Sequence, residues 1–454
     1  MARFREEGGA GPMRVFIAGI DGYLGWPLAQ HLAARGHEPA GVDALLRRAW
    51  VAEMGSDSAV PIASVDERRA AFRDHFGVSL PFSPVNVRDH TALGRLLRDV
   101  APDVVVHLAE CPSAPYSMID FRHADFVQGN NVSGTLSLLF AMREHCPDAH
   151  LVKLGSMGEY GTPDVDIPEG FFEVEFRGRR DVLPFPRQAG SWYHWSKVFD
   201  SQNVAFACRL WGLRATDVMQ GVVYGSWCPE DPRLNSRLDF DEAFGTAVHR
   251  FCCQAVTGRP ITPYGSGAQR RGLLSLADAL QCLTLALENP PAAGEYRVFN
   301  QLREVLSVGR LAELVRGAAH RLGIEAYVSA VDNPRAEAEQ HHYHPDHEKL
   351  PALGFRPSAP IEDELQRLLR DLLPYADRIA DHAGSLPPTV RWRPPPTAAP
   401  APTAASVPAP TATSTPPAAA GVRNPPEEGK GNERDTAPGH ADRGRGTGRP
   451  ARTA

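Results

Sequence analysis

Three residues of this chain could together oxidise a secondary alcohol: Ser156, Tyr193 and Lys197. Tyr193 precedes Lys197 by four positions, so on one helix both side chains lie on the same face. The ammonium is expected to lower the pKa of the phenol, which could then take a proton near neutral pH. Ser156 ends a predicted strand, where its hydroxyl could hold the same substrate oxygen. A Tyr-x-x-x-Lys pair alone is a weak signal, so the interpretation depends on a hydride acceptor beside it.

The N-terminal segment predicts that acceptor site. A buried strand over 14–18 runs into Gly19, Gly22 and Gly25, and an apolar-periodic helix follows to about residue 35. Glycines between a strand and a helix permit a tight turn and close approach to a pyrophosphate, which the helix N-terminus favours. Asp43 ends a second strand, where a carboxylate binds a ribose diol and repels a 2′-phosphate. The pattern therefore predicts NAD rather than NADP.

Arg47 and Arg48 follow that aspartate closely. They could blur the preference for NAD, or they could form the solvated start of a helix.

Composition excludes several classes of protein. The formal net charge is −6 and the isoelectric point is about 6.3, so no surface for a nucleic acid is implied. No apolar run is long enough to span a bilayer, and the N-terminus has no hydrophobic signal segment. The seven cysteines show no Cys-x-x-Cys spacing, which favours a reducing cytoplasm.

Four segments are expected along the chain. Residues 1–12 form a flexible leader, and residues 13–225 form mainly an NAD-binding domain. Residues 226–393 form mainly a nucleotide-sugar-binding lobe, with some elements returning to the first domain. Residues 394–454, rich in Pro, Ala and Thr at first and then in Gly, Arg and Glu, are expected to be disordered because they have little apolar surface to bury.

Apolar runs over 104–107, 150–154, 215–218 and 222–225 alternate with helical patterns. This alternation predicts an α/β fold with a doubly wound, Rossmann-type parallel sheet. Ser156 and the loop after His107 then lie at the carboxyl ends of strands, where such sheets bind ligands.

The chain resembles the UDP-sulfoquinovose synthases, a family within the extended short-chain dehydrogenase/reductase superfamily. The similarity runs from about Met13 to Trp392. It rests on the segments Val42-Asp43, 61–64, 113–120, 130–132, 153–163, 220–225, 297–301 and 333–335.

This resemblance implies a reaction on UDP-glucose with bound NAD. C4 is oxidised, the ketone acidifies the C5 proton, and loss of that proton and the C6 hydroxyl gives an enone-like intermediate. Sulfite then adds at C6 and C4 is reduced again. Tyr193 would be the base, Lys197 would tune it and bind the nicotinamide ribose, and Ser156 would hold the C4 oxygen.

The resemblance also assigns binding residues. Those expected at the cofactor are Gly19, Gly22, Tyr23, Leu24, Gly25, Asp43, Arg47, Asn86, Val87, Asn131, Tyr193 and Lys197. Those expected at the sugar nucleotide are Ser113, Tyr116, Met157, Glu159, Gln220, Tyr264, Arg271 and Arg335. Asn131 could instead satisfy nearby helix backbone, and either arginine could form a surface ion pair.

Met157-Gly158 distinguishes the chain from the dTDP-glucose 4,6-dehydratases, which carry an Asp-Glu pair after the hydroxyl residue. His194 is therefore the candidate for proton transfer at C5 and C6, with an expected pKa near 6.5. Glu159 is a weaker candidate, which could equally make a structural hydrogen bond.

Three departures from the family stand out. Cys111-Pro112 replaces a Gln-Arg pair whose arginine could serve sulfite, Val85-Asn86-Val87 replaces Gly-Asp-Ile near the adenine, and Met219 replaces an asparagine. Cys111 is expected to be an unactivated thiol. A relative that makes a sugar other than sulfoquinovose is consistent with these changes.

Two other functions remain open: a UDP-sugar 4-epimerase or related oxidoreductase, and a non-enzymatic cofactor-binding scaffold. The histidine-rich run 340–347 has no spacing of a closed zinc site, so no metal is expected. The superfamily also implies a homodimer through the helix near 130–144 and the helix that carries Tyr193.

Overall fold

A computed structural model describes residues 11–338 and 340–393 of the chain. Most of the expected leader and the whole of the expected disordered tail, residues 394–454, lie outside the described residues.

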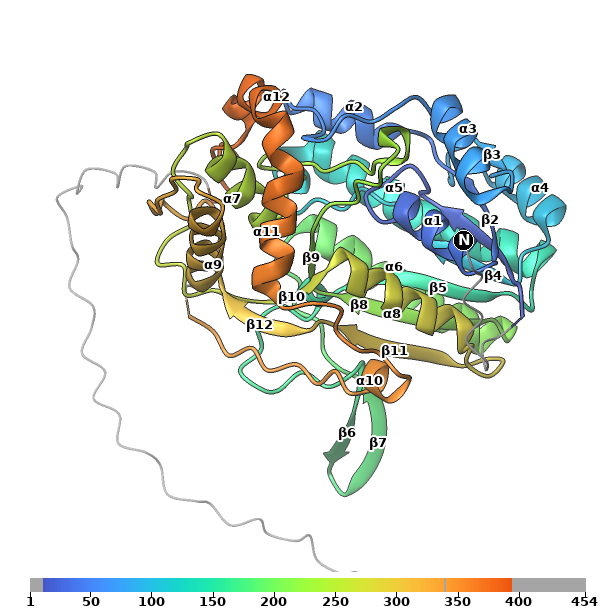
Figure 1. The fold of residues 1–454 in the computed structure, drawn as a ribbon. Coiled ribbons are helices and arrows are strands. Elements are labelled where there is room, and N and C mark those ends of the chain that lie inside the picture. The colour runs from blue at the N-terminus through green and yellow to red at the C-terminus, as the bar shows by residue number, and fades with distance from the viewer. Residues whose placement is uncertain (1–10, 339, 394–454) are drawn as a thin grey trace, which may run out of the picture. The chain divides into compact units, whose positions relative to one another are not determined.

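A seven-stranded parallel sheet forms the centre of the fold, as the alternating apolar runs predict (Figure 1). The strand order is β11-β8-β5-β4-β1-β2-β3, and every neighbouring pair is parallel. The strands are β1 (Arg14–Ala18), β2 (Glu38–Val42), β3 (Phe82–Ser83), β4 (Val104–His107), β5 (His150–Ser156), β8 (Arg214–Gln220) and β11 (Tyr296–Gln301). The prediction of a doubly wound α/β fold is confirmed.

Helices pack on both faces of this sheet through two separate apolar cores. One core joins β1 and β4 to α1 (Gly25–Ala34), α3 (Val65–Phe76) and α8 (Leu276–Glu288). The other joins the sheet to α4 (His90–Val100), α5 (Phe121–His145) and α6 (Trp192–Trp211). Because buried apolar area stabilises the fold at roughly 25 cal/mol per Å², these two cores fix the sheet against its helices.

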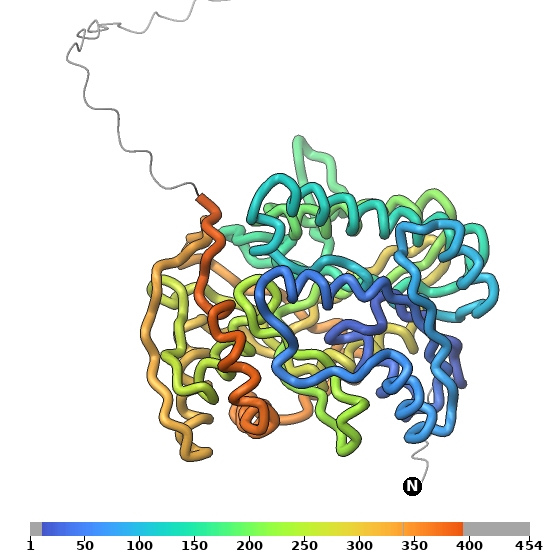
Figure 2. The backbone as a smooth tube through the Cα atoms, turned by 90° about the horizontal axis from the view of Figure 1, so that it is seen from above, coloured from blue at the N-terminus to red at the C-terminus, as the bar shows by residue number. Residues whose placement is uncertain are grey.

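A second lobe is built around its own core of helices. These are α7 (Ala247–Val256), α9 (Val308–Arg321), α11 (Ile361–Leu372) and α12 (Ala376–Asp381). They pack near a three-stranded sheet of β9 (Val222–Tyr224), β10 (Arg270–Ser275) and β12 (Glu304–Ser307). Figure 2 shows this lobe, in yellow-green to orange, on one side of the molecule and helices α3 and α4 on the other.

Chain order and spatial order differ in this lobe. After β10, helix α8 returns to cover the central sheet and β11 joins it as an edge strand. Residues 270–272 form the start of β10, which pairs with β9 and β12. Such pairing between distant segments carries no local sequence signal.

Smaller elements complete the fold. The hairpin of β6 (Phe171–Phe176) and β7 (Arg179–Pro184) projects from the edge of the molecule in Figure 1. The short helices are α2 (Leu46–Glu53) and α10 (Lys349–Ala352), with 3-10 turns η1 (Tyr116–Met118), η2 (Met157–Glu159), η3 (Pro232–Leu234), η4 (Leu373–Tyr375) and η5 (Ala383–Ser385). None of the helices in the described part of the chain has the length and apolarity needed to cross a membrane.

Candidate active site

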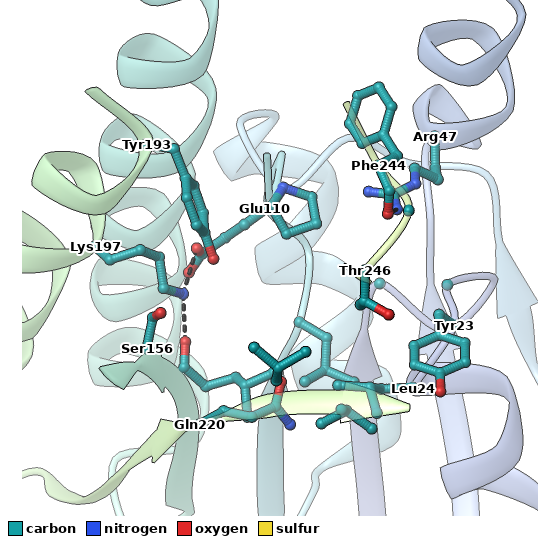
Figure 3. A pocket seen from close by; sticks show the side chains of 18 of the residues that line it. Tyr23, Leu24, Arg47, Glu110, Ser156, Tyr193, Lys197, Gln220, Phe244 and Thr246 are labelled. Atoms are coloured by element: carbon teal, nitrogen blue, oxygen red, sulfur yellow. Dashed lines mark hydrogen bonds and ion pairs between the residues drawn. The ribbon is translucent and has the colours of Figure 1, made fainter. Parts of the chain in front are cut away.

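A cavity of about 410 Å³ lies at the edge of the central sheet where the parallel strands end. Its wall contains the glycine loop that follows β1 and, across from it, Ser156, Tyr193 and Lys197 (Figure 3). Because β1, β2, β4, β5 and β8 all end at this edge, residues from five separate segments of the chain meet there.

The glycine loop is packed so closely that side chains do not fit. Gly19 has φ +89°, and a Cβ there would lie 2.7 Å from the carbonyl carbon of Leu108. A Cβ on Gly25 would lie 2.2 Å from the carbonyl oxygen of Gly19. The loop therefore leaves the backbone and the N-terminus of α1 facing the cavity, which is the arrangement that binds a pyrophosphate. Tyr23 and Leu24 complete this wall, and the Tyr23 hydroxyl donates to the carbonyl of Gly225 at 2.8 Å.

Asp43 lines the cavity directly after β2. Its two carboxylate oxygens accept hydrogen bonds from the backbone N–H groups of Leu45, at 2.7 Å, and Asp21, at 3.0 Å. Burial, and then the charge of Asp21, raise the pKa of Asp43 to about 6. The carboxylate is thus oriented by backbone donors and retains lone pairs for a ribose diol.

The two arginines beside Asp43 are both held by carboxylates. Arg47 donates to Asp239 at 2.7 Å and its guanidinium lies 4.2 Å from the centre of the Phe244 ring. Arg48 donates to both oxygens of Asp21, at 2.8 and 2.9 Å. Each guanidinium already pairs with a carboxylate, which would compete with the 2′-phosphate of NADP. The site therefore fits NAD better than NADP. Arg47 lines the cavity and Arg48 does not.

Val85, Asn86 and Val87 line the end of the cavity that follows β3. The Asn86 side-chain oxygen accepts from the N–H of Arg88 at 2.9 Å, which leaves its amide N–H₂ group as a donor. The substituted segment therefore retains one polar group where an adenine is expected.

Ser156 ends β5 and caps the 3-10 turn η2 that follows. Its hydroxyl accepts from the N–H of Gly158 at 3.1 Å, and its own N–H donates to Glu159 at 2.9 Å. Glu159 is fully buried and also pairs with Arg187, so it holds the Ser156 backbone from behind the cavity wall. These contacts agree with the structural hydrogen bond considered for Glu159.

Tyr193 and Lys197 lie one helical turn apart on α6, and both line the cavity. The Lys197 ammonium donates to Glu110 and to the carbonyl of Leu154 (Figure 3). Although burial opposes it, Glu110 and then Asp200 raise the pKa of Lys197.

The lowered pKa expected for Tyr193 is not found in this structure. Burial, and then the carboxylate of Glu110, raise the pKa of the phenol well above its usual range. The Lys197 ammonium forms an ion pair with Glu110, and this carboxylate offsets most of the electrostatic effect of the ammonium on the Tyr193 phenol.

His194 stacks over the turn that follows Ser156. Its Nδ1 lies 2.9 Å from the Ser191 hydroxyl, and a Cβ on Gly158 would lie 2.3 Å from its Nε2. Position 158 must therefore be glycine for this ring position, so the second carboxylate of the 4,6-dehydratase pair does not fit here. Burial, and then the charges of Arg335 and Arg271, lower the pKa of His194 to about 3 rather than the expected 6.5.

The expected sugar-nucleotide residues divide into two groups. Gln220, Tyr264, Arg271 and Arg335 line the cavity. Arg271 pairs with Glu337 there, and the Arg335 guanidinium lies 5.9 Å from the centre of the Tyr264 ring.

The second group lies behind the wall. Ser113 donates to the carbonyl of Ala243 at 2.6 Å, and Tyr116 donates to Glu53 at 2.6 Å. Asn131 is fully buried, accepts from the N–H of Cys111 at 2.8 Å and donates to Ser196 at 2.9 Å. These three residues, with Met157, Glu159 and His194, do not line the cavity.

Glu110, Thr246, Arg250 and Gln269 are among the polar cavity residues that the sequence does not predict. Glu110 follows β4 by three residues, at the edge where ligands bind, and that position was its only signal. Arg250 on α7 donates to the Tyr264 hydroxyl and adds a third guanidinium beside Arg271 and Arg335. Nothing in the local pattern of α7 marks it.

The histidine-rich run lies away from this site. His342 Nε2 is 2.7 Å from Asp166, and His344 Nδ1 is 3.5 Å from the same carboxylate. Among residues 11–338 and 340–393, no group of His, Cys, Asp and Glu side chains has the arrangement of a metal site.

The fold is that of a Rossmann-type, NAD-dependent enzyme, and Ser156, Tyr193 and Lys197 lie together in its cavity. Residues 15–300 match the NAD dependent epimerase/dehydratase family, and the chain belongs to that family. The UDP-sulfoquinovose synthase of Sulfolobus acidocaldarius is 45% identical over 384 residues, which are 84% of this chain and 98% of that protein. The chloroplastic UDP-sulfoquinovose synthase of Spinacia oleracea is also 45% identical, over 85% of this chain and 80% of that protein. The resemblance found from the sequence is confirmed.

Solved structures agree with the fold. A UDP-glucuronic acid 4-epimerase from Bacillus cereus, in complex with UDP-glucuronic acid and NAD, has a TM-score of 0.60 at 20% identity, covering 79% of this chain and 99% of that one. A UDP-glucose 4-epimerase from Thermus thermophilus, in complex with NAD, has a TM-score of 0.57 at 24% identity and covers the same shares.

Protonation of Asp43 should weaken NAD binding. We expect the affinity of the wild-type protein to fall as the pH falls through about 6, because a protonated carboxyl accepts the ribose hydroxyls less well. Asp43→Asn should bind about tenfold more weakly at neutral pH and lose this pH dependence, as measured by calorimetry. Asp241→Asn is the matched control, because Asp241 has a pKa raised to about 6 but lies outside the cavity wall. The same pH dependence in wild type and Asp43→Asn would contradict the role of Asp43.

Gly158→Ala should displace the His194 ring, since a methyl group at that position overlaps Nε2. We expect a loss of turnover of about tenfold or more, because small displacements of active-site groups are costly. Gly190→Ala is the control, as a Cβ at Gly190 meets nothing within 4 Å. Steady-state kinetics compare the two, and equal activities would show that the position of His194 is unimportant.

Proposed function

We propose that this chain is a UDP-sulfoquinovose synthase-like enzyme that oxidises UDP-glucose at C4, eliminates across C5 and C6, and adds sulfite or another nucleophile at C6. The observation that carries the proposal is the joining of Ser156, Tyr193 and Lys197 to the glycine loop in one cavity. The 45% identity to two UDP-sulfoquinovose synthases supports the sugar and the reaction.

Bound NAD would accept the hydride from C4 and return it after the addition. The glycine loop and the N-terminus of α1 would hold the pyrophosphate, Asp43 the adenosine ribose, and Asn86 the adenine. The residues fit this group because the glycines leave room for it and Asp43 faces the cavity without a free arginine beside it.

The protein side chains would manage the protons. Ser156 would bind the C4 oxygen, and Tyr193 would take its proton during oxidation and return it during re-reduction. The UDP diphosphate would lie against Arg250, Arg271 and Arg335, whose guanidinium groups converge on one end of the cavity.

We keep His194 as the candidate for proton transfer at C5, although it does not line the cavity and its imidazole is neutral at physiological pH. Two of the three charges that lower its pKa are Arg335 and Arg271. A bound diphosphate would offset both charges, so its pKa should rise towards the range useful for acid–base catalysis.

Product analysis tests the proposal. Full-length protein with NAD and UDP-glucose in D₂O, with sulfite, should give a sulfite-dependent UDP-sulfosugar by mass spectrometry. Deuterium at C5 without a sulfonated product would show that C4 oxidation and exchange of the C5 proton occur, and that the natural nucleophile is not sulfite. C4 inversion with the C6 oxygen retained would favour a 4-epimerase. Tyr193→Phe should lower every product by about 10²-fold or more, and unchanged output from that variant would favour a scaffold.

We also propose a homodimer through α5 and α6. Phe199, Phe206 and Leu210 are 46%, 50% and 54% exposed and recur along one stripe of α6, with Leu136 of α5, 44% exposed, as a further apolar residue. Exposed apolar side chains at helical spacing are typical of a helix-to-helix interface.

Phe206→Asp should convert the dimer to a monomer, because a buried unpaired carboxylate is costly. Light scattering at micromolar concentration measures the change. Leu373→Asp, at a 42% exposed position on η4, should leave the mass unchanged. A monomeric wild-type protein would refute the proposal.

A further inference from the structure

Glu110 is a carboxylate inside the active site that the reaction proposed above does not use. It follows β4 and is 8% exposed, and it lines the cavity together with Tyr193 and Lys197. One of its oxygens, Oε2, accepts from the Lys197 ammonium. The other, Oε1, is buried without a hydrogen-bond partner and lies 3.7 Å from Nε2 of His107.

His107 cannot neutralise this carboxylate. Its Nε2 lies 3.0 Å from the Thr135 hydroxyl, and burial, followed by Lys197 and Lys153, lowers its pKa to about 3. Lys197 is therefore the only cation in hydrogen-bonding contact with Glu110 among the described residues.

Lys197 is fixed from two sides. The carbonyl of Leu154, at the end of β5, accepts a second hydrogen bond from its ammonium. A lysine held by a carboxylate and a carbonyl has one N–H left to donate elsewhere. Because the positive charge of Lys197 is paired with Glu110, it has less effect on the pKa of Tyr193, one helical turn away.

We propose that Glu110 is a positioning residue that holds Lys197 against the end of β5 and, by neutralising its charge, keeps Tyr193 a protonated phenol. The proposal rests on the proposed function for the meaning of this state. A protonated Tyr193 is the form that returns a proton to the C4 oxygen when the sugar is reduced again. Glu110 thereby favours the step that completes the cycle, the reduction of the C4 ketone, over the oxidation that starts it.

Other charged groups around the pair do not replace Glu110. Lys153 on β5 faces Asp217, and Glu159 on η2 faces Arg187. Asp200, one turn beyond Lys197 on α6, is fully buried, and its pKa is raised well above its usual value by burial and by Glu110. Cys111 is a buried thiol whose pKa is raised by burial. Within the described part of the chain, neither Asp200 nor Cys111 forms a hydrogen bond or an ion pair with Lys197.

The first test needs no turnover. Ultraviolet titration of the full-length protein reports ionisation of its ten tyrosines, and subtracting a Tyr193→Phe partner isolates one of them. For wild type minus Tyr193→Phe, we expect the Tyr193 step above about pH 10. For Glu110→Gln minus Glu110→Gln/Tyr193→Phe, the step should fall by about one pH unit or more, since the Lys197 charge is released.

The second test is the pH profile of NAD reduction by UDP-glucose. The ascending limb for Glu110→Gln should lie about one pH unit or more below that of wild type. Glu110→Asp should restore the wild-type limb because it keeps the charge. Asp200→Asn is the matched control, because it removes a neighbouring buried carboxyl group that does not contact the Lys197 ammonium, and its limb should move less than that of Glu110→Gln.

The two tests separate the possible failures. An unchanged titration and an unchanged limb in Glu110→Gln would overturn the role of Glu110, even if its turnover fell. A wild-type protein that reduces no NAD with UDP-glucose would instead refute the proposed function, and the titration would still decide the role of Glu110.

Discussion

The active site depends on four buried charges behind the end of β5. Lys153 lies 3.4 Å from Asp217 and 3.7 Å from Glu159, and Arg187 pairs with Glu159. Two cations and two carboxylates balance, and Ser201 donates to Asp217 at 2.6 Å. Burying such charges is costly unless all are paired, and removal of one partner typically costs about 3–5 kcal/mol. Because Glu159 also accepts a hydrogen bond from the N–H of Ser156, this network fixes the position of Ser156 in the cavity wall.

The network also links the site to the rest of the sheet. Asp217 lies on β8, and its carboxylate accepts from Tyr296 of the edge strand β11 at 2.6 Å. Although burial opposes it, Lys153 and Arg187 hold the pKa of Asp217 below its usual value. The edge strand, which comes late in the chain, therefore contributes to the same polar core that orients Ser156.

The glycine loop, Asp43, Ser156 and the Tyr193–Lys197 pair were predictable because each rests on a short local pattern. The roles of Arg250 and Glu110 were not predictable, because both residues reach the cavity only when distant segments of the chain meet at the edge of the sheet. The same reason explains the error at Tyr193. A four-residue spacing places Lys197 on the same face of α6 as Tyr193. The direction of its ammonium is set instead by Glu110, which follows β4, and by the carbonyl of Leu154, near the end of β5.

The two departures at positions 111 and 112 have different consequences, although they are adjacent. Cys111 is fully buried and packs in a core with Trp50, Tyr116 and Phe244, so a thiol there affects packing. Pro112 lines the cavity, where the related synthases are expected to place an arginine. Among the residues that the structure describes, an apolar ring at this point leaves no cation on this part of the cavity wall. Position 112 is therefore where this chain's choice of nucleophile should differ from that of its relatives, because an anionic nucleophile would find no guanidinium at this point of the wall.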